Sequence, residues 1–426
     1  MRVLVVGGGG REHALCSALR KSAFVEELFC APGNPGIAEL ADCLPVSTGD
    51  IVELADLASQ LQMDLTVVGP ELPLSLGIVD EFAKRDLPAF GPTSLAAQIE
   101  TSKVFSKEFC KRHGIPTAEA QICSSLDQAR KAIRKFGLPV VVKADGLAAG
   151  KGVLILDEKK EVDRALHLFF DERVFGSAGD KVLVEEFLTG SEASFLVVTD
   201  GETVVPLPTA RDYKKVFDGD RGPNTGGMGA HSPAGILDSA ASSRILKEIV
   251  YPAVRGLASE GRPFRGVLYA GVILTEDGPK VLEFNARFGD PEAEVILPRV
   301  ASDVAALLLA ATRGELVKFP ALDVRPEACV GVVLASAGYP GPIEKGRKIE
   351  GLSEAGRLPG IEVFHSGTAR QGDALVTAGG RVLVVTATGP GLADAAARAY
   401  EAADRIRFEG RTLRRDIAAG VRATRT

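Results

Sequence analysis

The chain has 426 residues, of which 46% are hydrophobic and 25% are charged. These fractions are typical of a folded globular protein, and they exclude a disordered chain, a fibre and a small disulfide-stabilised domain. The 50 Lys and Arg residues are outnumbered by 56 Asp and Glu residues, so the net charge is −6. An acidic chain is a poor general ligand for nucleic acid or an anionic membrane, and we expect neither partner.

The cysteines and the start of the chain predict the compartment. Met1 is followed at once by Arg2 and a short apolar segment, without the pattern of a signal peptide. No apolar run approaches the ~18 residues that a membrane helix needs. The cysteines form no C-x-x-C pair, and we expect them to be small buried residues of a reduced, cytoplasmic protein: Cys16, Cys30, Cys43, Cys110, Cys123 and Cys329.

The first hundred residues alternate apolar strands with amphipathic helices. Strands are expected at residues 3–6, 28–31 and 65–69, and helices at residues 11–21 and 51–61. This alternation predicts a Rossmann-like, parallel, doubly wound sheet. One longer helical stretch is expected at residues 93–113, ended by Gly114 and Pro116.

The middle of the chain has a different pattern. Residues 205–235 are rich in Gly and Pro with little periodicity, so we expect a long functional loop there. Strands between glycine-containing turns favour a mixed or antiparallel sheet, and they are expected at residues 139–144, 153–156, 182–187, 193–199, 268–274 and 280–284.

The last hundred residues form a third unit. Gly314, Pro320 and Pro326 mark a boundary near residues 314–327. Strands are then expected at residues 330–336, 362–365 and 381–386, before a helix at residues 392–406. The whole pattern predicts a multidomain chain of mixed α/β and α+β type, with about three domains.

Three glycine-rich loops follow predicted strands near the N-terminus. They are residues 7–10, 32–36 and 69–71, and in a parallel sheet such loops line one crevice. Glycines at the start of a helix let backbone amides approach a phosphate. The dinucleotide fingerprint G-x-G-x-x-G ends at Glu12 or His13 rather than glycine, and no acidic residue closes the second strand. The loops therefore favour a phosphate ligand other than NAD.

A lysine and a glycine-rich hairpin occupy the middle of the chain. Lys143 lies inside an apolar strand, where an ammonium group needs an anionic partner. The following loop ends in Gly150, Lys151 and Gly152, and a strand comes next, so it is a lid hairpin and not a P-loop.

An acidic strand supplies the best candidate for a metal site. Residues two apart on a strand share a face, so we expect Val281, Glu283, Asn285 and Arg287 to point together. Two oxygen donors suit Mg²⁺ when phosphates and water complete its coordination. Arg287 would add a fork for an anionic oxygen.

Taken in order, these segments resemble the ATP-grasp ligases, and in particular the glycinamide ribonucleotide synthetase family. The resemblance spans essentially the whole chain. It is carried by Gly8-Gly9-Gly10-Arg11-Glu12-His13-Ala14, Ala31-Pro32-Gly33-Asn34, Val68-Gly69-Pro70-Glu71, Lys143 to Gly152, Glu185-Glu186-Phe187-Leu188, Gly222 to Gly229, Glu283-Phe284-Asn285 and Arg287 to Glu292. Three segments depart from the family pattern: Arg211-Asp212-Tyr213-Lys214 stands where Gln-Asp-His-Lys is expected, His231 where Tyr is usual, and Ala286 where Cys is usual. Tyr213 cannot act as an imidazole base.

The resemblance implies an architecture and a reaction. The domains would be an N-terminal substrate domain (1–100), an ATP-grasp domain (101–325) with a lid at about 120–190, and a C-terminal domain (326–426). The implied reaction joins glycine to 5-phospho-β-D-ribosylamine through glycyl phosphate, with ATP converted to ADP and phosphate, in de novo purine biosynthesis. Phosphoryl transfer of this kind needs positioning and charge neutralisation more than a protein nucleophile.

The resemblance also implies the site residues. Catalysis would use Arg287, Lys151, Asp212 and Lys214. ATP would contact Lys103, Lys143, Gly150, Lys151, Gly152, Glu185, Glu186, Leu188 and Glu192. Phosphoribosylamine or glycine would contact Gly9, Gly10, Arg11, Asn34, Glu71, Asn224, Thr225, Gly226, Gly227, Met228, Arg287 and Asp290. Glu283 and Asn285 would hold Mg²⁺ or Mn²⁺.

Three alternatives stay open. Another ATP-grasp carboxylate–amine ligase or carboxylase shares the lysines and the acidic strand. An NAD-dependent dehydrogenase is disfavoured by the incomplete fingerprint. A non-catalytic nucleotide-binding regulator would not need Glu283 and Asn285. We expect a monomer, while the metal, the order of binding, the extent of lid motion and the roles of Tyr213 and the C-terminal domain are not determined by the sequence.

Overall fold

The N-terminal domain is a five-stranded parallel sheet, as the alternating pattern predicted. The computed structural model describes residues 1–146, 152–172, 174 and 176–420. The strand order is β3-β2-β1-β4-β5. The strands are β1 (Arg2–Gly7), β2 (Glu27–Pro32), β3 (Asp42–Cys43), β4 (Leu65–Val68) and β5 (Ala89–Phe90), with helices α1 (Gly10–Arg20), α2 (Ile51–Gln60), α3 (Glu71–Ser75) and α4 (Ile78–Ala83).

Both faces of this sheet are buried, which explains its uninterrupted apolar strands. Val3 and Val5 pack with Leu15 of α1 on one face. Leu4 and Val6 pack with Leu54 of α2 on the other. Because β1 lies between β2 and β4, the loops after these strands meet at one edge.

The single helix expected at residues 93–113 is wrong, because two helices occupy this stretch. They are α5 (Ser94–Thr101) and α6 (Lys103–Arg112). Ser102 between them has an extended backbone, and its hydroxyl accepts a hydrogen bond from the amide of Phe105. Serine caps helices in this way, so it both ends α5 and begins α6.

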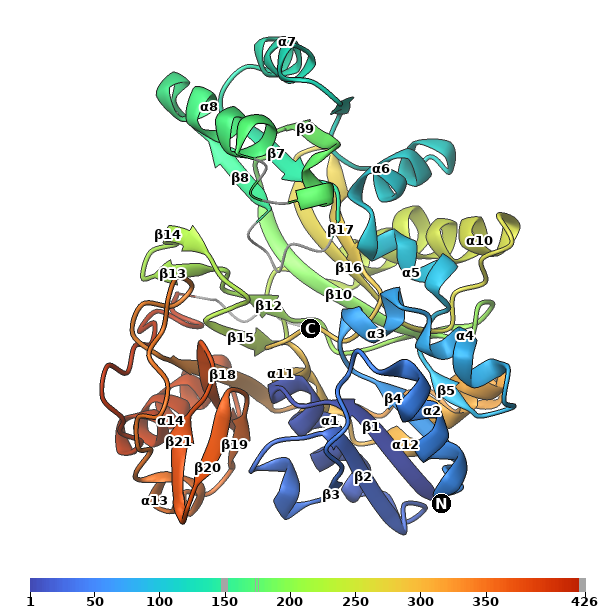
Figure 1. Ribbon diagram of the computed structural model, residues 1–426, viewed down its shortest axis with the longest axis vertical. Coiled ribbons are helices and arrows are strands. Elements are labelled where there is room, and N and C mark those ends of the chain that lie inside the picture. Colours follow the sequence, from blue (N-terminus) through green and yellow to red (C-terminus); the bar gives the residue numbers. More distant parts are fainter. Residues whose placement is uncertain (147–151, 173, 175, 421–426) are drawn as a thin grey trace.

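A small antiparallel sheet forms the lid, in the order β6-β9-β7-β8. It consists of β6 (Ala120–Cys123), β7 (Val140–Ala144), β8 (Val153–Leu156) and β9 (Val182–Glu186), with helices α7 (Leu126–Phe136) and α8 (Lys159–Leu166). The lid has a hydrophobic core of its own, around Val142, Val184 and Phe169. It lies at the top of the molecule in Figure 1.

The central sheet carries the acidic strand. Its order is β11-β10-β16-β17, all antiparallel. The strands are β10 (Ser191–Thr199), β11 (Val204–Pro206), β16 (Gly266–Thr275) and β17 (Gly278–Asn285), and the neighbouring helices are α9 (Ser239–Ile245), α10 (Tyr251–Ser259), α11 (Ala293–Ile296) and α12 (Val304–Arg313).

A β-bulge corrects the predicted face of Val281. Gly271 pairs with Glu283 but the next residue, Val272, pairs with Val281, so Leu282 is an extra residue in β17. An extra residue reverses the alternation of side chains. Val281 therefore joins the hydrophobic core with Phe284, opposite to Glu283.

The expectation of a long loop at residues 205–235 is also wrong. This stretch holds β12 (Arg211–Asp212), β13 (Lys215–Phe217), β14 (Arg221–Asn224) and β15 (Gly229–Ser232). Short strands with Gly and Pro show no clear periodicity in the sequence. The strand β15 joins the sheet of the third unit by pairing with β18 (Ala328–Ala335).

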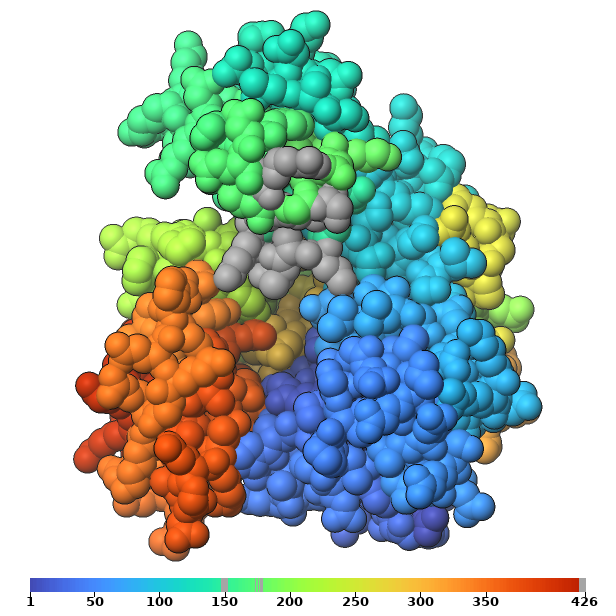
Figure 2. Space-filling view, viewed as in Figure 1, coloured from blue at the N-terminus to red at the C-terminus, as the bar shows by residue number. Residues whose placement is uncertain are grey.

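The third unit is built on the sheet β12-β15-β18-β22-β19. Its predicted strands are present as β18, β19 (Ile361–His365) and β22 (Arg381–Gly389), with the predicted helix α14 (Leu392–Arg405). A hairpin of β20 (Thr368–Gln371) and β21 (Ala374–Thr377) and the helix α13 (Leu352–Gly356) complete it. Figure 2 shows a hollow below the lid, between the blue N-terminal and orange C-terminal regions.

The cysteines match the expectation of burial with one exception. Five of the six cysteines are buried, but Cys43 on the edge strand β3 is exposed, against the prediction. Within the described ranges, no helix is long and apolar enough to cross a bilayer.

Candidate active site

Glu12 fills the space beneath the front loops. Its carboxylate accepts a hydrogen bond from the amide of Gly9 at 2.7 Å and pairs with Arg11 at 2.6 Å. A methyl group on Gly69 would lie 2.1 Å from Oε1 of Glu12. A carboxylate thus occupies the position that a dinucleotide loop keeps as glycine, which argues against the NAD alternative.

Asn34 joins the second front loop to the C-terminal domain. Its amide nitrogen donates to the carbonyls of Gly8 at 3.0 Å and His365 at 2.8 Å. Its side-chain oxygen accepts from the amides of Gly36 and Ile37. The side chain of Asn34 therefore shapes the loop, and a substrate contact would come from the loop that it holds.

Arg287 links the acidic strand to the front loops. Its guanidinium pairs with Glu71 of α3 at 3.2 Å and with Glu100 of α5 at 2.9 Å. Burial raises the pKa of Glu71, but the charges of Arg287 and Arg11 outweigh it and the pKa is lowered. Burial dominates at Glu100 and raises its pKa in spite of Arg287. Arg287 therefore forms its ion pairs with Glu71 and Glu100 and not with Glu283.

Lys143 has the anionic partner that its buried position demands. Its ammonium pairs with Glu185 on the neighbouring strand β9 at 2.7 Å and donates to the carbonyl of Leu282 in the bulge at 3.2 Å. Lys107 of α6 pairs with the other oxygen of Glu185 at 2.9 Å. Burial raises the pKa of Glu185, but these two lysines outweigh it and lower it. Glu185 therefore orients Lys143 across the gap between lid and central sheet.

The helix break at Ser102 places Lys103 at the root of the lid hairpin. Lys103 donates to the carbonyl of Gly146 at 3.0 Å, and Ser102 donates to Asp145 at 2.9 Å. Burial lowers the pKa of Lys103. Gly150 and Lys151 lie outside the described residues, and Gly152 precedes β8.

Glu283 faces several cations. Lys214 approaches it at 3.5 Å and also approaches Glu192 at 3.8 Å. Burial raises the pKa of Glu283, but the charges of Lys214, Lys143 and Lys103 outweigh it and lower it to about 2. Nearby, burial raises the pKa of Asp212 to about 7 against the charge of Lys214.

Glu283 and Asn285 fit a divalent cation. Glu283 is ionised at neutral pH, and both side chains leave β17 on one face. The side-chain oxygen of Asn285 accepts a long hydrogen bond from Arg287, at 3.3 Å. Carboxylate and amide oxygens are hard donors of the kind that Mg²⁺ accepts.

The loop at residues 224–229 lies between the central sheet and the C-terminal domain. The backbone carbonyl of Lys214 accepts hydrogen bonds from both the amide and the hydroxyl of Thr225. The hydroxyl of Tyr339 accepts from the amide of Gly226 at 2.9 Å. Gly227 has a φ of +115°, which other residues rarely adopt. Met228, one of the predicted substrate residues, is fully buried and packs in the hydrophobic core.

Asp290 meets a cation that the sequence did not single out. Arg381, at the start of β22, pairs with Asp290 at 3.1 Å and donates to the carbonyl of Gly226 at 2.6 Å. Buried beside them, the oxygens of Glu294 and the hydroxyl of Ser366 have no hydrogen-bond partner within the described structure. Burial and the charge of Asp290 raise the pKa of Glu294.

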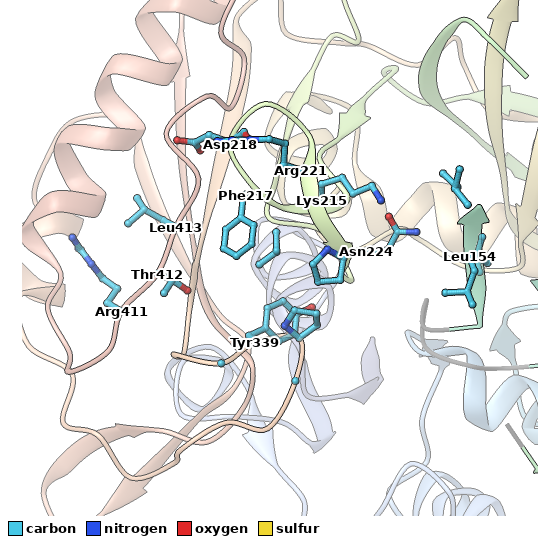
Figure 3. Close-up of a pocket in the computed structure, with 17 residues that line it drawn as sticks. Leu154, Lys215, Phe217, Asp218, Arg221, Asn224, Tyr339, Arg411, Thr412 and Leu413 are labelled. Carbon is cyan, nitrogen blue, oxygen red and sulfur yellow. The ribbon is translucent and has the colours of Figure 1, made fainter. Parts of the chain in front are cut away.

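A cavity of about 1210 Å³ adjoins this loop. In Figure 3 Lys215 and Asn224 point across it toward Leu154 of the lid strand β8, while Tyr339 lies below them. The cavity is therefore walled by the lid, the hairpin β13–β14 and the C-terminal domain.

The structure brings most of the predicted residues that it describes into two groups, which Arg287 connects through Glu71 and Asn285. Gly9, Asn34 and Glu71 meet at the front loops, while Lys103, Lys143 and Lys214 surround Glu283. Glu186 and Leu188 lie on and just after β9, and the carboxylate of Glu186 accepts from the amide of Glu119 within the lid. Sequence reasoning missed Glu100, Lys107 and Arg381. Glu100 and Arg381 could have been found as charged residues in mostly apolar segments, whereas Lys107 lies among other charged residues of α6 and gave no such signal.

The parallel front domain, the antiparallel lid over a central sheet, and the lysines facing an acidic strand define an ATP-grasp enzyme. The chain is 49% identical to phosphoribosylamine–glycine ligase of Allochromatium vinosum, over 98% of each chain. It superposes on the crystal structure of phosphoribosylamine–glycine ligase from Thermotoga maritima with a TM-score of 0.84 at 36% identity, covering 98% of this chain and 100% of that one.

The family is established along the chain. Residues 1–100, 101–293 and 329–420 match the N, ATP-grasp (A) and C domains of phosphoribosylglycinamide synthetase. The chain belongs to this family, as its motifs predicted. The biotin carboxylase domain of 2-oxoglutarate carboxylase from Hydrogenobacter thermophilus has the same fold, with a TM-score of 0.73 at 18% identity, covering 96% of this chain and 91% of that chain.

Proposed function

We propose that this chain ligates glycine to 5-phospho-β-D-ribosylamine at the expense of ATP, forming glycinamide ribonucleotide, ADP and phosphate. Its membership of the phosphoribosylglycinamide synthetase family and its ATP-grasp fold support the proposal. We also propose that it acts in the cytoplasm as a monomer.

The proposed chemistry has two steps. A carboxylate oxygen of glycine attacks the γ-phosphorus of ATP, the bond to ADP breaks, and glycyl phosphate forms. The amine nitrogen of phosphoribosylamine then attacks the glycyl carbonyl, loses a proton, and phosphate leaves. Both steps move negative charge, so the site must neutralise charge and hold the reactants in line.

We assign the neutralisation of charge to lysines and to a divalent cation. Lys143, held by Glu185, and Lys103 neutralise ATP phosphates. Glu283 and Asn285 would hold Mg²⁺ or Mn²⁺, which supplies positive charge at the phosphates when bound. Lys214 and Asp212 lie beside Glu283. In the proposed reaction, Lys214 neutralises charge on the transferred phosphoryl group.

Other groups bind and protect the substrates. Glu186, Leu188 and Glu192 line the adenosine end, and Gly150, Lys151 and Gly152 bind the ATP phosphates. Gly9, Gly10, Arg11, Asn34, Glu71, Asp290 and the 224–229 loop bind the sugar phosphate. Exclusion of water matters because an acyl phosphate hydrolyses readily.

The bridge made by Arg287 carries the proposal. This one guanidinium contacts Asn285 on the metal-binding face and Glu71 in the front loops. These two contacts support our proposal that the nucleotide and the sugar phosphate bind on either side of Arg287, with the glycine carboxylate between them.

The test is the substrate dependence of ADP release. We expect ADP release to require glycine and to become rapid only when phosphoribosylamine is also present. Hydroxylamine should trap glycyl hydroxamate when ATP and glycine are supplied without the amine. ADP release that does not depend on glycine would instead favour another ATP-grasp ligase or carboxylase.

A further inference from the structure

The last described residues of the chain fold back onto the segment that carries Lys214. After α14, residues 411–420 run beside the hairpin β13–β14. In Figure 3 Thr412 and Leu413 lie on one side of Phe217, while Lys215 and Asn224 lie on the side facing the lid. The C-terminal tail is thus close to the active site in space although it is distant in sequence.

Arg414 makes the main connection between tail and hairpin. Its side chain is 1% exposed. The guanidinium binds Asp416 through two nitrogens at 2.7 Å, Asp220 at 2.8 Å and the carbonyl of Lys215 at 3.0 Å. A buried arginine is tolerated only when its donors are satisfied, and the planar fork fixes the direction of each bond. Arg414 therefore fixes the backbone one residue beyond Lys214.

Tyr213 fixes the backbone on the other side of Lys214. The guanidinium of Arg414 lies 5.0 Å from the centre of its ring. Its hydroxyl accepts a hydrogen bond from the amide of Ala418 at 2.9 Å. Its own backbone bonds to Gly229 and Met228. The side chain of Tyr213 is therefore engaged by the tail, while its neighbour Lys214 reaches Glu283.

We propose that Arg414 is a positioning residue, which holds the 213–215 backbone so that the ammonium of Lys214 stands between Glu192 and Glu283. Tyr213 contributes to the same support, because its ring packs against Arg414 and its hydroxyl binds the amide of Ala418. This inference rests on the function proposed above for Lys214. It also gives a role to the tyrosine that replaces the histidine expected at position 213.

A merely structural anchor would act differently. The neighbouring Arg415 is also in the tail, but its side chain is 49% exposed and it pairs with Asp404 on α14. Within the described structure, Arg415 does not contact the backbone of residues 213–215. Arg415→Met is therefore a matched control that loosens the tail without touching the support of Lys214.

The experiment is a double-mutant cycle between Arg414 and Lys214 in the full-length enzyme. The first variant is Arg414→Met with Asp416→Asn, so that the half-buried carboxylate of Asp416 is not left unpaired. We expect kcat to fall at least ~10-fold while KM for ATP changes by less than ~2-fold, because a misplaced reacting group slows chemistry more than binding. In a Lys214→Met background the same substitutions should cause little further loss, since a residue that acts through Lys214 has no effect once Lys214 is gone.

Two milder variants keep the test decisive if the first does not fold. Arg414→Lys keeps the charge but not the fork, and Tyr213→Phe removes only the hydroxyl. We expect each to lower kcat by at least about threefold, with the same non-additivity toward Lys214→Met and with Arg415→Met unchanged.

The outcomes separate this inference from the function on which it rests. Folded Arg414 and Tyr213 variants with normal kcat, or losses that add fully to that of Lys214→Met, would overturn the positioning role alone. If Lys214→Met itself retains normal turnover, the role of Lys214 and this inference both fail. The proposed reaction is tested separately, by the glycine dependence of ADP release in the unaltered enzyme, so the results with these variants do not decide it.

Discussion

Lys143 and Glu185 form an ion pair at 2.7 Å across the neighbouring strands β7 and β9 of the lid. Lys107 reaches the same carboxylate from α6 at 2.9 Å. Glu185 therefore holds two lysines of different elements at one point, and only one of them, Lys143, extends to the bulge in the acidic strand. We therefore expect this carboxylate to affect ATP binding through Lys143.

Replacing Glu185 with Gln should weaken ATP binding. The amide keeps the shape but removes the charge that balances Lys143 and Lys107, so the lysines repel each other and Lys143 loses its fixed position. We expect KM for ATP to rise about tenfold, the effect of losing roughly one buried charge-assisted contact. Steady-state kinetics with varied ATP would measure it.

The control is Glu119→Gln in the same lid. Glu119 is exposed and pairs with Lys135 on the surface. Exposed pairs contribute little, so its KM for ATP should match that of the unaltered enzyme. Equal effects of the two substitutions would contradict the role of Glu185.

Glu283→Ala should remove most of the activity. It takes away a carboxylate that is ionised at neutral pH and faces Lys214. We expect kcat to fall at least ~10²-fold and the concentration of Mg²⁺ needed for half-maximal rate to rise, because charge compensation at the phosphoryl group is lost. A variant that turns over normally at saturating Mg²⁺ would rule out the metal assignment, and Glu248→Ala on the surface serves as the control.

Gly69→Ala should destabilise the N-terminal domain. The added methyl would lie 2.1 Å from Oε1 of the buried Glu12, which cannot move without disturbing Gly9 and Arg11. Overpacking of this kind costs about 1–3 kcal/mol. Chemical denaturation would show the loss. Gly49→Ala, whose methyl would meet its nearest neighbour at 3.9 Å, should leave stability nearly unchanged.

Acid should weaken the junction of the N-terminal and C-terminal domains. His13 accepts a hydrogen bond from the amide of His365 at 2.8 Å, and burial together with the charge of His365 lowers its pKa to about 3. An unfolded histidine has a pKa near 6.5, so below that pH the unfolded state binds a proton that the folded state rejects. Stability from this group is complete above about pH 6.5 and falls as the pH drops toward 3.

Unfolding free energies measured between pH 7 and pH 4 would check this sign. The difference in slope between the unaltered chain and His13→Asn should approach about 1.4 kcal/mol per pH unit within that window. The exposed His167 is the control, because its pKa is raised by Asp171 and its loss should not flatten the acid limb. Identical slopes would contradict a buried, neutral His13.

Local patterns predicted the elements well where side chains repeat regularly. The apolar run before Gly7 and the apolar run before Lys143 predict β1 and β7 within a residue or two. They failed where a single residue changes the backbone. Ser102 divides one amphipathic stretch into two helices, and Leu282 inserts a bulge that turns Val281 away from Glu283. Such events depend on one hydrogen bond or one strand partner, which periodicity does not record.

The sequence by itself determined the family and the order of its domains, and it predicted which residue types form the site, because these depend on residue types at fixed local spacing. Glu283 and Asn285 share a face through strand geometry alone. Only the tertiary structure decided which charges meet: Arg287 with Glu71 and Glu100, Asp290 with Arg381, and Arg414 with the backbone beside Lys214. Those pairs join residues far apart in the chain, and electrostatic partners are set by distance in space after folding.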